Sequence, residues 1–306
     1  YNILTLNSIS EVGLNKLEPE KFAVSGEMAN PDGIILRSYE MKDMELPETL
    51  AGVARAGAGT NNIPIDKCSE KGIVVFNTPG ANANAVKELV LTGIFLSSRK
   101  IVDGIEWAKE LKGKENVDKL VEKGKGQFTG PEIKGKKLGV IGLGAIGVLV
   151  ANAAVGLGME VYGYDPYLSV DAAWNLSSDV IKATSMEALV AECDYITIHV
   201  PLNDNTRGMY NKELFAATKK GARLLNFARG GLVDTEALKT ALADGTITEY
   251  ITDFPDGEVI ELENVICIPH LGASTPESED NCAEMAAIEL KQYLEYGIIK
   301  NSVNFP

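Results

Sequence analysis

Residues 138–147 read Leu138-Gly139-Val140-Ile141-Gly142-Leu143-Gly144-Ala145-Ile146-Gly147, and this stretch indicates the fold class. An apolar strand runs directly into a G-x-G-x-x-G turn, and a helical run, Val148–Val155, follows it. In such a unit the first glycine makes the tight turn, the second lets backbone N–H groups approach a pyrophosphate, and the third lets helix and strand pack closely. The stretch therefore predicts a dinucleotide-binding strand–turn–helix unit.

An acidic residue follows the turn where such a unit uses one. Asp165 ends the next predicted strand, about 20 residues past the glycines, where a carboxylate accepts hydrogen bonds from the adenosine ribose. Its charge would repel a 2′-phosphate, and Pro166 offers no cation to bind one, so NAD is predicted rather than NADP. A methyltransferase using S-adenosylmethionine has a similar turn and acid, but it does not need the histidine and arginine described below.

The glycine-rich stretch is long enough to resemble a membrane helix. No charged residue lies between Lys137 and Glu160. Its glycines, however, cluster where a strand would turn into a helix, which predicts a buried strand and a buried helix. No charged region followed by an apolar stretch opens the chain, so no secretory signal is visible in it.

On both sides of this stretch, Val- and Ile-rich runs alternate with amphipathic segments, the pattern of parallel sheets covered by helices. Two doubly wound α/β units in one chain are predicted, and the final helix, Pro276–Tyr296, need not belong to the unit that precedes it. The lysine- and glutamate-rich segment 109–125 is predicted to be a solvated helical excursion, with an oligomer arm as the alternative. The predicted strands are Asn2–Leu6, Gly33–Leu36, Gly52–Arg55, Gly72–Phe76, Lys137–Ile141, Glu160–Tyr164, Tyr195–Val200, Ala222–Asn226, Glu249–Thr252 and Val265–Ile268.

Composition narrows the class of protein. The chain has 306 residues, 45% of them hydrophobic and 24% charged, which favours a folded protein of two domains. Its formal net charge of −14 disfavours nucleic acid and anionic membrane surfaces as partners. The cysteines form no C-x-x-C pair and lie among apolar neighbours, which predicts buried thiols, a reducing cytoplasm and no metal site.

Two histidines are the candidates for acid/base chemistry. His270 lies in Pro269-His270-Leu271-Gly272, just past a predicted buried strand, where it can exchange a proton near neutral pH. His199 also lies at a strand end and is interpreted as a structural or cofactor-lining residue, with catalysis as the alternative.

An arginine follows another strand. Arg229 lies in Asn226-Phe227-Ala228-Arg229-Gly230-Gly231, and its small neighbours would let a ligand approach closely. A guanidinium can clamp a carboxylate through two hydrogen bonds, and the alternative is a surface ion pair. Arg229 is therefore the predicted substrate-binding cation.

Together these motifs resemble the D-isomer-specific 2-hydroxyacid dehydrogenases. Further matches are the segments 55–63 and 77–82 and the ending Asn301-Ser302-Val303-Asn304-Phe305-Pro306, so the resemblance covers essentially the whole chain. It implies a catalytic trio of arginine, glutamate and histidine, the first and last matching Arg229 and His270. The glutamate, counted five residues past Asp253, is Glu258. Asp256 and Glu261 are alternatives, because the segment before His270 is shorter than in most relatives.

The resemblance also implies the binding residues. By this analogy the cofactor contacts are Thr78, Gly142, Gly144, Ala145, Ile146, Gly147, Asp165, His199, Val200, Pro201, Thr206, Phe227, Ala228, Asp253 and Gly272. The implied substrate contacts are Arg37, Ser38, Arg55, Gly59, Thr60, Asn61 and Asn82.

The same resemblance implies a layout and a reaction. A Rossmann NAD-binding domain, residues 89–275, is inserted into a flavodoxin-like substrate or lid domain made of residues 1–88 and 276–306. The implied reaction transfers a hydride from C2 of D-3-phosphoglycerate to NAD in a cytoplasmic homodimer that associates through the nucleotide domain. The alternatives are a reductase of glyoxylate, hydroxypyruvate or another 2-keto acid, and an NAD-sensing corepressor-like binding protein.

Overall fold

The computed structural model describes residues 1–305, and the chain forms two compact units. Unit 1 combines residues 1–85 with the C-terminal segment that begins at Ala273. Unit 2 is the intervening stretch Val86–Gly272. Unit 1 is thus assembled from both ends of the sequence, and unit 2 from one continuous segment.

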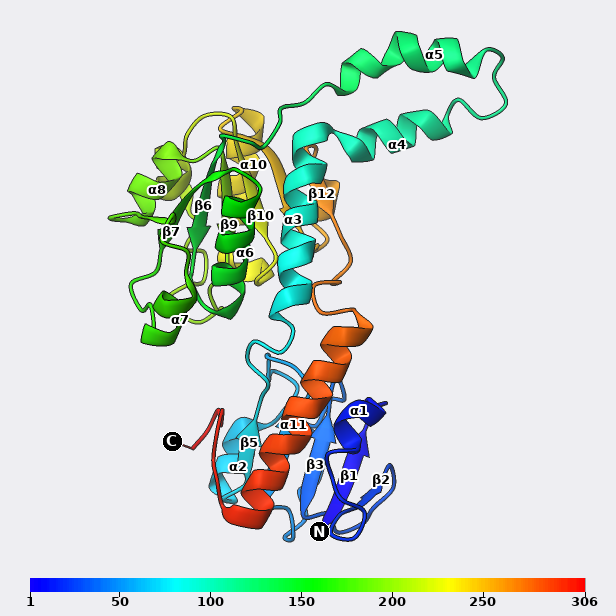
Figure 1. Ribbon diagram of the computed structural model, residues 1–306, viewed down its shortest axis with the longest axis vertical. Coiled ribbons are helices and arrows are strands. Elements are labelled where there is room, and N and C mark those ends of the chain that lie inside the picture. The colour runs from blue at the N-terminus through cyan, green and yellow to red at the C-terminus, as the bar shows by residue number, and fades with distance from the viewer. Residues whose placement is uncertain (306) are drawn as a thin grey trace. The chain divides into compact units, whose positions relative to one another are not determined.

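Unit 1 contains a parallel sheet in the order β2-β1-β3-β4-β5, the flavodoxin-like order (Figure 1). Its strands are β1 (Asn2–Leu6), β2 (Ala23–Ser25), β3 (Gly33–Leu36), β4 (Gly52–Arg55) and β5 (Val74–Phe76). Its helices are α1 (Glu11–Leu14), α2 (Ile65–Glu70) and α11 (Pro276–Tyr296).

Helices cover both faces of this sheet because its strands are apolar on both sides. In β3, Ile35 packs in a cluster with residues of α11, whereas its neighbour Ile34 packs in the cluster that includes Cys68 of α2. The fully buried Leu290 anchors α11 in the first cluster, which explains why the last helix belongs with the first strands. Burial of one leucine side chain contributes about 2 kcal/mol.

Unit 2 contains a parallel sheet in the order β12-β11-β10-β9-β6-β7-β8, which is the Rossmann order with one added strand (Figure 1). Its strands are β6 (Lys137–Ile141), β7 (Glu160–Tyr164), β8 (Ile181–Lys182), β9 (Tyr195–Ile198), β10 (Ala222–Asn226), β11 (Ile247–Thr252) and β12 (Val265–Cys267). Its helices are α3 (Ala83–Arg99), which begins in unit 1, α4 (Ile101–Lys109), α5 (Val117–Gly124), α6 (Ala145–Gly156), α7 (Val170–Asn175), α8 (Met186–Glu192), α9 (Lys212–Ala217) and α10 (Thr235–Ala243). Its short 3-10 helices are η1 (Lys125–Phe128), η2 (Gly230–Leu232) and η3 (Val259–Glu261).

Two apolar clusters show which helices cover each face of the unit 2 sheet. One contains residues of α3 and α6, including Val90 and Val150, and the other contains residues of α8, α9 and α10, including Leu189 and Phe215. The strand order reverses between β6 and β9, so the carboxyl ends of these strands form the crevice where open α/β sheets bind ligands.

The structure confirms the predicted fold class and revises details within it. Two strands were not predicted, β2 and β8, which are three and two residues long and lie at sheet edges. The four cysteines are free thiols, of which Cys267 is only half-buried. Within residues 1–305, no helix has the length and hydropathy to cross a membrane, and no cluster of three His, Cys, Asp or Glu side chains is arranged to hold a metal ion.

Candidate active site

The three glycines of the turn after β6 differ in their surroundings. Gly142 has φ of +91°, and a Cβ there would lie 2.6 Å from the His199 carbonyl oxygen. A Cβ at Gly147 would lie 1.9 Å from the Gly142 carbonyl oxygen, whereas a Cβ at Gly144 would meet nothing within 4 Å. The first and third glycines are therefore required by packing, and the second leaves space above the turn for a ligand.

Helix α6 begins at this open position. Ala145 and Ile146 form its first turn, and the N-cap residue Gly144 provides no side-chain hydrogen bond to the backbone N–H groups. Uncapped N–H groups at a helix start favour an anion such as a pyrophosphate. Asp165, at the end of β7, accepts hydrogen bonds from the backbone N–H groups of Leu143 and Tyr167, both at 2.8 Å. This carboxylate therefore lies over the glycine turn.

The loop after β9 carries the next predicted cofactor residues. Val200 and Pro201 follow this strand, and Thr206 closes the loop by donating a hydrogen bond of 2.6 Å to the Pro201 carbonyl oxygen. His199 shares a 2.9 Å hydrogen bond between its Nε2 and the Thr197 hydroxyl, while its buried Nδ1 has no partner. Burial lowers the pKa of His199 to about 3, so this ring is neutral near pH 7 and unsuited to accept a catalytic proton.

A buried asparagine, which sequence reasoning did not single out, sets the position of Arg229. Asn226 at the end of β10 donates from its amide to the Arg229 carbonyl oxygen at 2.8 Å. Its Oδ1 accepts hydrogen bonds from the N–H groups of Ala228 and Arg229 at 3.2 and 3.3 Å. These bonds fix the turn that buries Phe227 and leaves the Arg229 side chain exposed. The sequence feature that could have identified this residue is an asparagine at the end of an apolar strand, immediately before the predicted ligand-binding loop.

Phe254 brings Arg229 and His270 to one place. The His270 ring lies 4.5 Å from the Phe254 ring, centroid to centroid, and the Arg229 guanidinium carbon lies 5.8 Å from the centroid of the same ring. Both polar side chains are exposed. The predicted base and the predicted carboxylate clamp thus share an aromatic neighbour at the carboxyl-end edge of the sheet. Phe254 was not predicted to be a site residue, because an aromatic residue that follows a strand can have many other structural roles.

Asp253 lies beside this pair. Its carboxylate is 1% exposed, and one oxygen accepts a hydrogen bond from the Gly272 N–H at 3.1 Å. The other oxygen, Oδ1, is buried without a hydrogen-bond partner. Unpartnered buried polar atoms at Asp253 and His199, with the open space at Gly144, fit a dinucleotide lying along this edge of unit 2.

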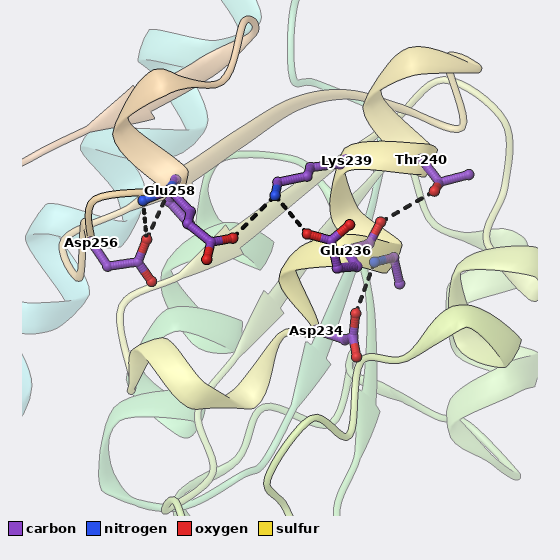
Figure 2. Close-up of polar contacts among 8 residues, drawn as sticks. Asp234, Glu236, Lys239, Thr240, Asp256 and Glu258 are labelled. Carbon is purple, nitrogen blue, oxygen red and sulfur yellow. Dashed lines mark hydrogen bonds and ion pairs between the residues drawn. The ribbon is translucent and has the colours of Figure 1, made fainter.

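The structure does not place Glu258 against His270. Its carboxylate lies 3.0 Å from the Lys239 ammonium group, which also binds Glu236 at 2.6 Å (Figure 2). Asp256 accepts the backbone N–H groups of Glu258 and Val259, and Glu261 is exposed in η3. Across residues 1–305, no hydrogen bond or ion pair joins His270 to any of these three acids.

The predicted substrate contacts and Thr78 lie in unit 1. Arg37 follows β3 and is paired with Glu279 at 2.7 Å, and Arg55 ends β4 and donates from Nε to the Arg37 carbonyl oxygen at 3.0 Å. The backbone N–H of Ser38 donates to Asn7 at 3.0 Å. Unit 1 therefore concentrates two guanidinium groups at the carboxyl ends of adjacent strands. The remaining predicted residues lie in the loops after β4 and β5, namely Gly59, Thr60, Asn61, Thr78 and Asn82.

The chain is similar to known dehydrogenases over most of its length. Residues 92–272 match the family model described as "D-isomer specific 2-hydroxyacid dehydrogenase, NAD binding domain". D-3-phosphoglycerate dehydrogenase of Homo sapiens is 33% identical over 308 residues, covering 97% of this chain and 55% of the relative. The enzyme of the same name from Methanocaldococcus jannaschii is 36% identical over 275 residues, covering 86% of this chain and 49% of the relative. The chain thus spans about half the length of these curated relatives.

A solved structure extends the comparison. The NAD⁺-bound 3-phosphoglycerate dehydrogenase of Entamoeba histolytica is 26% identical, with a TM-score of 0.76, and the match covers 99% of this chain and 98% of that one. The similarity to this structure therefore includes both units. The match to the family model, residues 92–272, includes all the site residues of unit 2, from Gly142 to Gly272.

Proposed function

Because this chain belongs to the D-isomer-specific 2-hydroxyacid dehydrogenase family and carries its NAD-binding domain, we propose that it oxidises D-3-phosphoglycerate at C2 to 3-phosphohydroxypyruvate. This would be the first step of the phosphorylated serine pathway. The observation that carries the proposal is the joint packing of Arg229 and His270 on Phe254. A carboxylate clamp and a proton acceptor at one place are what the oxidation of a 2-hydroxy acid requires.

Each side chain has a distinct task. Arg229 forms two hydrogen bonds to the substrate carboxylate and so orients C2. His270 accepts the proton of the C2 hydroxyl as the C2–H bond breaks, and it returns the proton when the keto acid is reduced. When bound, NAD supplies the acceptor for the hydride.

Residues of both units are candidates to hold these ligands. In unit 2 the N–H groups at the start of α6 are suited to the pyrophosphate and Asp165 to the adenosine ribose. In unit 1, Arg37 and Arg55 are suited to a phosphate group, which supports a phosphorylated substrate. Thr78 and the predicted loop residues of unit 1 stay predictions.

The test is an NADH absorbance assay with D-3-phosphoglycerate, D-glycerate, D-lactate, glyoxylate and hydroxypyruvate. We expect kcat/KM for D-3-phosphoglycerate to exceed that for D-glycerate by at least about 100-fold, because two charge-assisted pairs to phosphate contribute about 3 kcal/mol. Faster turnover of an unphosphorylated acid would reassign the substrate. Absence of turnover with every acid, in a chain that binds NAD, would favour a binding protein.

We further propose that the chain forms a homodimer through unit 2. Helices α4 and α5 project away from the sheet of that unit in Figure 1, and neither contains a buried residue. Apolar side chains on this arm are exposed, among them Ile105 at 51% and Val117 at 40%. A second copy covering the arm would remove this apolar surface from water.

A further inference from the structure

A pocket of about 500 Å³ lies within unit 1, a volume typical of sites for small molecules. Three segments line it: one side of α11, the loop after β5, and the tail, residues 297–305, which returns beside β5 (Figure 1). Within residues 1–305, none of the residues predicted above to contact cofactor or substrate lines this pocket. The proposed reaction therefore does not explain it.

The pocket contains a buried carboxyl group with one unsatisfied oxygen. Glu289 on α11 is 4% exposed, and its Oε1 accepts a hydrogen bond of 2.6 Å from the Asn301 side-chain amide. The other oxygen, Oε2, is buried and has no hydrogen-bond partner among the described residues. It stays unpaired whether the carboxyl group is ionised or protonated, and an unpaired buried polar atom is unfavourable. Glu289 therefore lacks a partner that a ligand can supply.

The tail holds this carboxyl group in place. Asn301, which binds Oε1, is itself fixed, because its carbonyl oxygen accepts the Asn77 N–H at 3.3 Å. The next residue, Ser302, pairs with Phe76 at the end of β5. Turning Oε2 out to water would break the bond between Oε1 and Asn301. The contacts of the tail thus keep a hydrogen-bond acceptor at the wall of the pocket.

The other side chains of the pocket define the class of ligand. Met285 and Ile288 on α11 supply apolar surface, and Lys300 in the tail supplies an exposed cation. Glu284, the second carboxylate of the pocket, already pairs with Lys16 at 2.9 Å. An ammonium group is the strongest donor for a buried carboxylate, because both partners are then charged. Lys300 disfavours a second cation in the ligand and favours an anionic group.

We propose that this pocket binds a small linear amino acid in which an apolar chain separates the ammonium group from the carboxylate. The ammonium group donates a hydrogen bond to Oε2 of Glu289. The chain lies over Met285 and Ile288, and the carboxylate pairs with Lys300. The site uses groups of unit 1 alone, so the proposal does not depend on which hydroxy acid the chain oxidises.

The test uses δ-aminovalerate, n-butylamine and n-butanol as probes of the full chain, with Kd measured by saturation-transfer difference NMR at pH 8. We expect n-butanol, which lacks the charge, to bind at least about tenfold more weakly than n-butylamine. δ-Aminovalerate should bind about threefold more tightly than n-butylamine, because an exposed ion pair with Lys300 contributes modestly. Equal binding of the alcohol and the amine would overturn the proposal, and so would equal binding of the amine and the amino acid.

Variants assign the binding to this pocket. In Glu289→Gln the side-chain oxygen keeps its bond to Asn301 and an NH₂ group replaces Oε2, so the Kd of δ-aminovalerate should rise at least about tenfold. In Lys300→Met, δ-aminovalerate should bind no more tightly than n-butylamine. Glu284→Gln is the control, because Lys16 already pairs with this carboxylate, and it should change the Kd by less than about twofold. Unchanged binding in Glu289→Gln would place the probes elsewhere and overturn the proposal.

The pH dependence of binding to the wild-type chain is an independent test. Burial raises the pKa of Glu289 to about 7, and Asn301 and Lys300 act less strongly in the opposite direction. δ-Aminovalerate keeps both its charges between pH 5.5 and 8, so its Kd should rise about tenfold or more as the pH falls over this range and Glu289 is protonated. The other charged groups of the pocket are Glu284 and Lys300, and the dependence should persist in Glu284→Gln. An affinity that is independent of pH, or a dependence that Glu284→Gln abolishes, would overturn the assignment of the ammonium group to Glu289.

Discussion

At the scale of residues, the two histidines differ because of burial. His199 is half-buried, with its Nε2 bonded to Thr197 and its Nδ1 buried, while His270 is exposed against Phe254. We predict that His270→Ala lowers kcat by about 100-fold or more, the usual contribution of a general base, without changing NAD affinity. Steady-state kinetics and quenching of intrinsic fluorescence by NADH measure the two quantities. Unchanged kcat would remove His270 from the reaction.

A buried carboxyl on α11 makes the stability of unit 1 depend on pH. Burial raises the pKa of Glu289 to about 7, against which Asn301, bonded to it at 2.6 Å, and Lys300 act less strongly. The folded chain therefore retains a proton that the unfolded chain releases near pH 4.5, so stability falls as the pH rises from about 4.5 to 7.

Glu289→Gln removes this dependence. We expect the free energy of unfolding of the variant to exceed that of the wild type by about 1 to 3 kcal/mol at pH 8 and by little at pH 5. The reason is that Glu289 is only 4% exposed, so keeping its carboxylate ionised in the folded chain is unfavourable. Urea unfolding at both pH values measures the difference. Glu284→Gln, which alters an exposed carboxylate on the same helix, is the control and should show no such dependence. An equal gain at both pH values would contradict the assignment.

The sequence predicted residue types at strand ends better than it predicted their partners. Arg229 could be found because it follows an apolar strand and has small neighbours, and His270 because it is one of two histidines and follows another apolar strand. Glu258 was chosen by counting along the chain from Asp253, and counting cannot reveal that Lys239, 19 residues earlier, holds the carboxylate. Asn226 and Phe254 were missed for the same reason, since their roles consist of contacts with other loops.

At the scale of elements, the turn between β6 and α6 offers a matched pair of tests. Gly147→Ala would place a methyl group 1.9 Å from a carbonyl oxygen, so we expect loss of at least about 3 kcal/mol of stability. Gly144→Ala places the methyl group in open space at φ of −76°, so the chain should fold normally. It should nevertheless bind NAD about tenfold or more weakly, because the methyl group occupies the space above the turn.

Chemical denaturation and NADH titration distinguish the two variants. Gly156→Ala is the control, because this glycine also has open space at its Cβ position but lies at the far end of α6. It should retain NAD affinity. Equal NAD affinity in Gly144→Ala and wild type would show that the open space is not the pyrophosphate site.

Elements with strong apolar patterns were predicted almost to the residue. The bounds of β1, β3, β4, β6, β7, β10 and α11 agree with the expected segments, whereas β5, β9, β11 and β12 differ from them by one or two residues at one end. The unpredicted strand β8, Ile181–Lys182, pairs only with β7 and is exposed, so no buried pattern marked it in the sequence. Edge strands of this kind are defined by their neighbours rather than by their own residues.

At the scale of the whole molecule, the charged segment after α3 has two competing interpretations. A solvated surface and an oligomer arm both predict lysines and glutamates facing water, and the exposed Ile101, Ile105 and Val117 favour the arm. The arm also has an internal aromatic contact, since Trp107 lies 5.4 Å from Phe128, centroid to centroid. A segment that packs on itself and exposes aliphatic side chains is suited to a second protein surface.

We therefore predict that light scattering on a size-exclusion column gives twice the mass of one chain. Ile105→Lys, which adds a charge to the exposed aliphatic side chains of the arm, should shift the mass toward that of one chain by weakening the dimer by about 2 kcal/mol or more. Trp174→Lys changes an 85% exposed residue of α7, outside the arm, and should leave the mass unchanged. A wild-type mass of one chain at micromolar concentration would contradict the dimer. Equal effects of the two substitutions would instead assign the interface to another surface of unit 2.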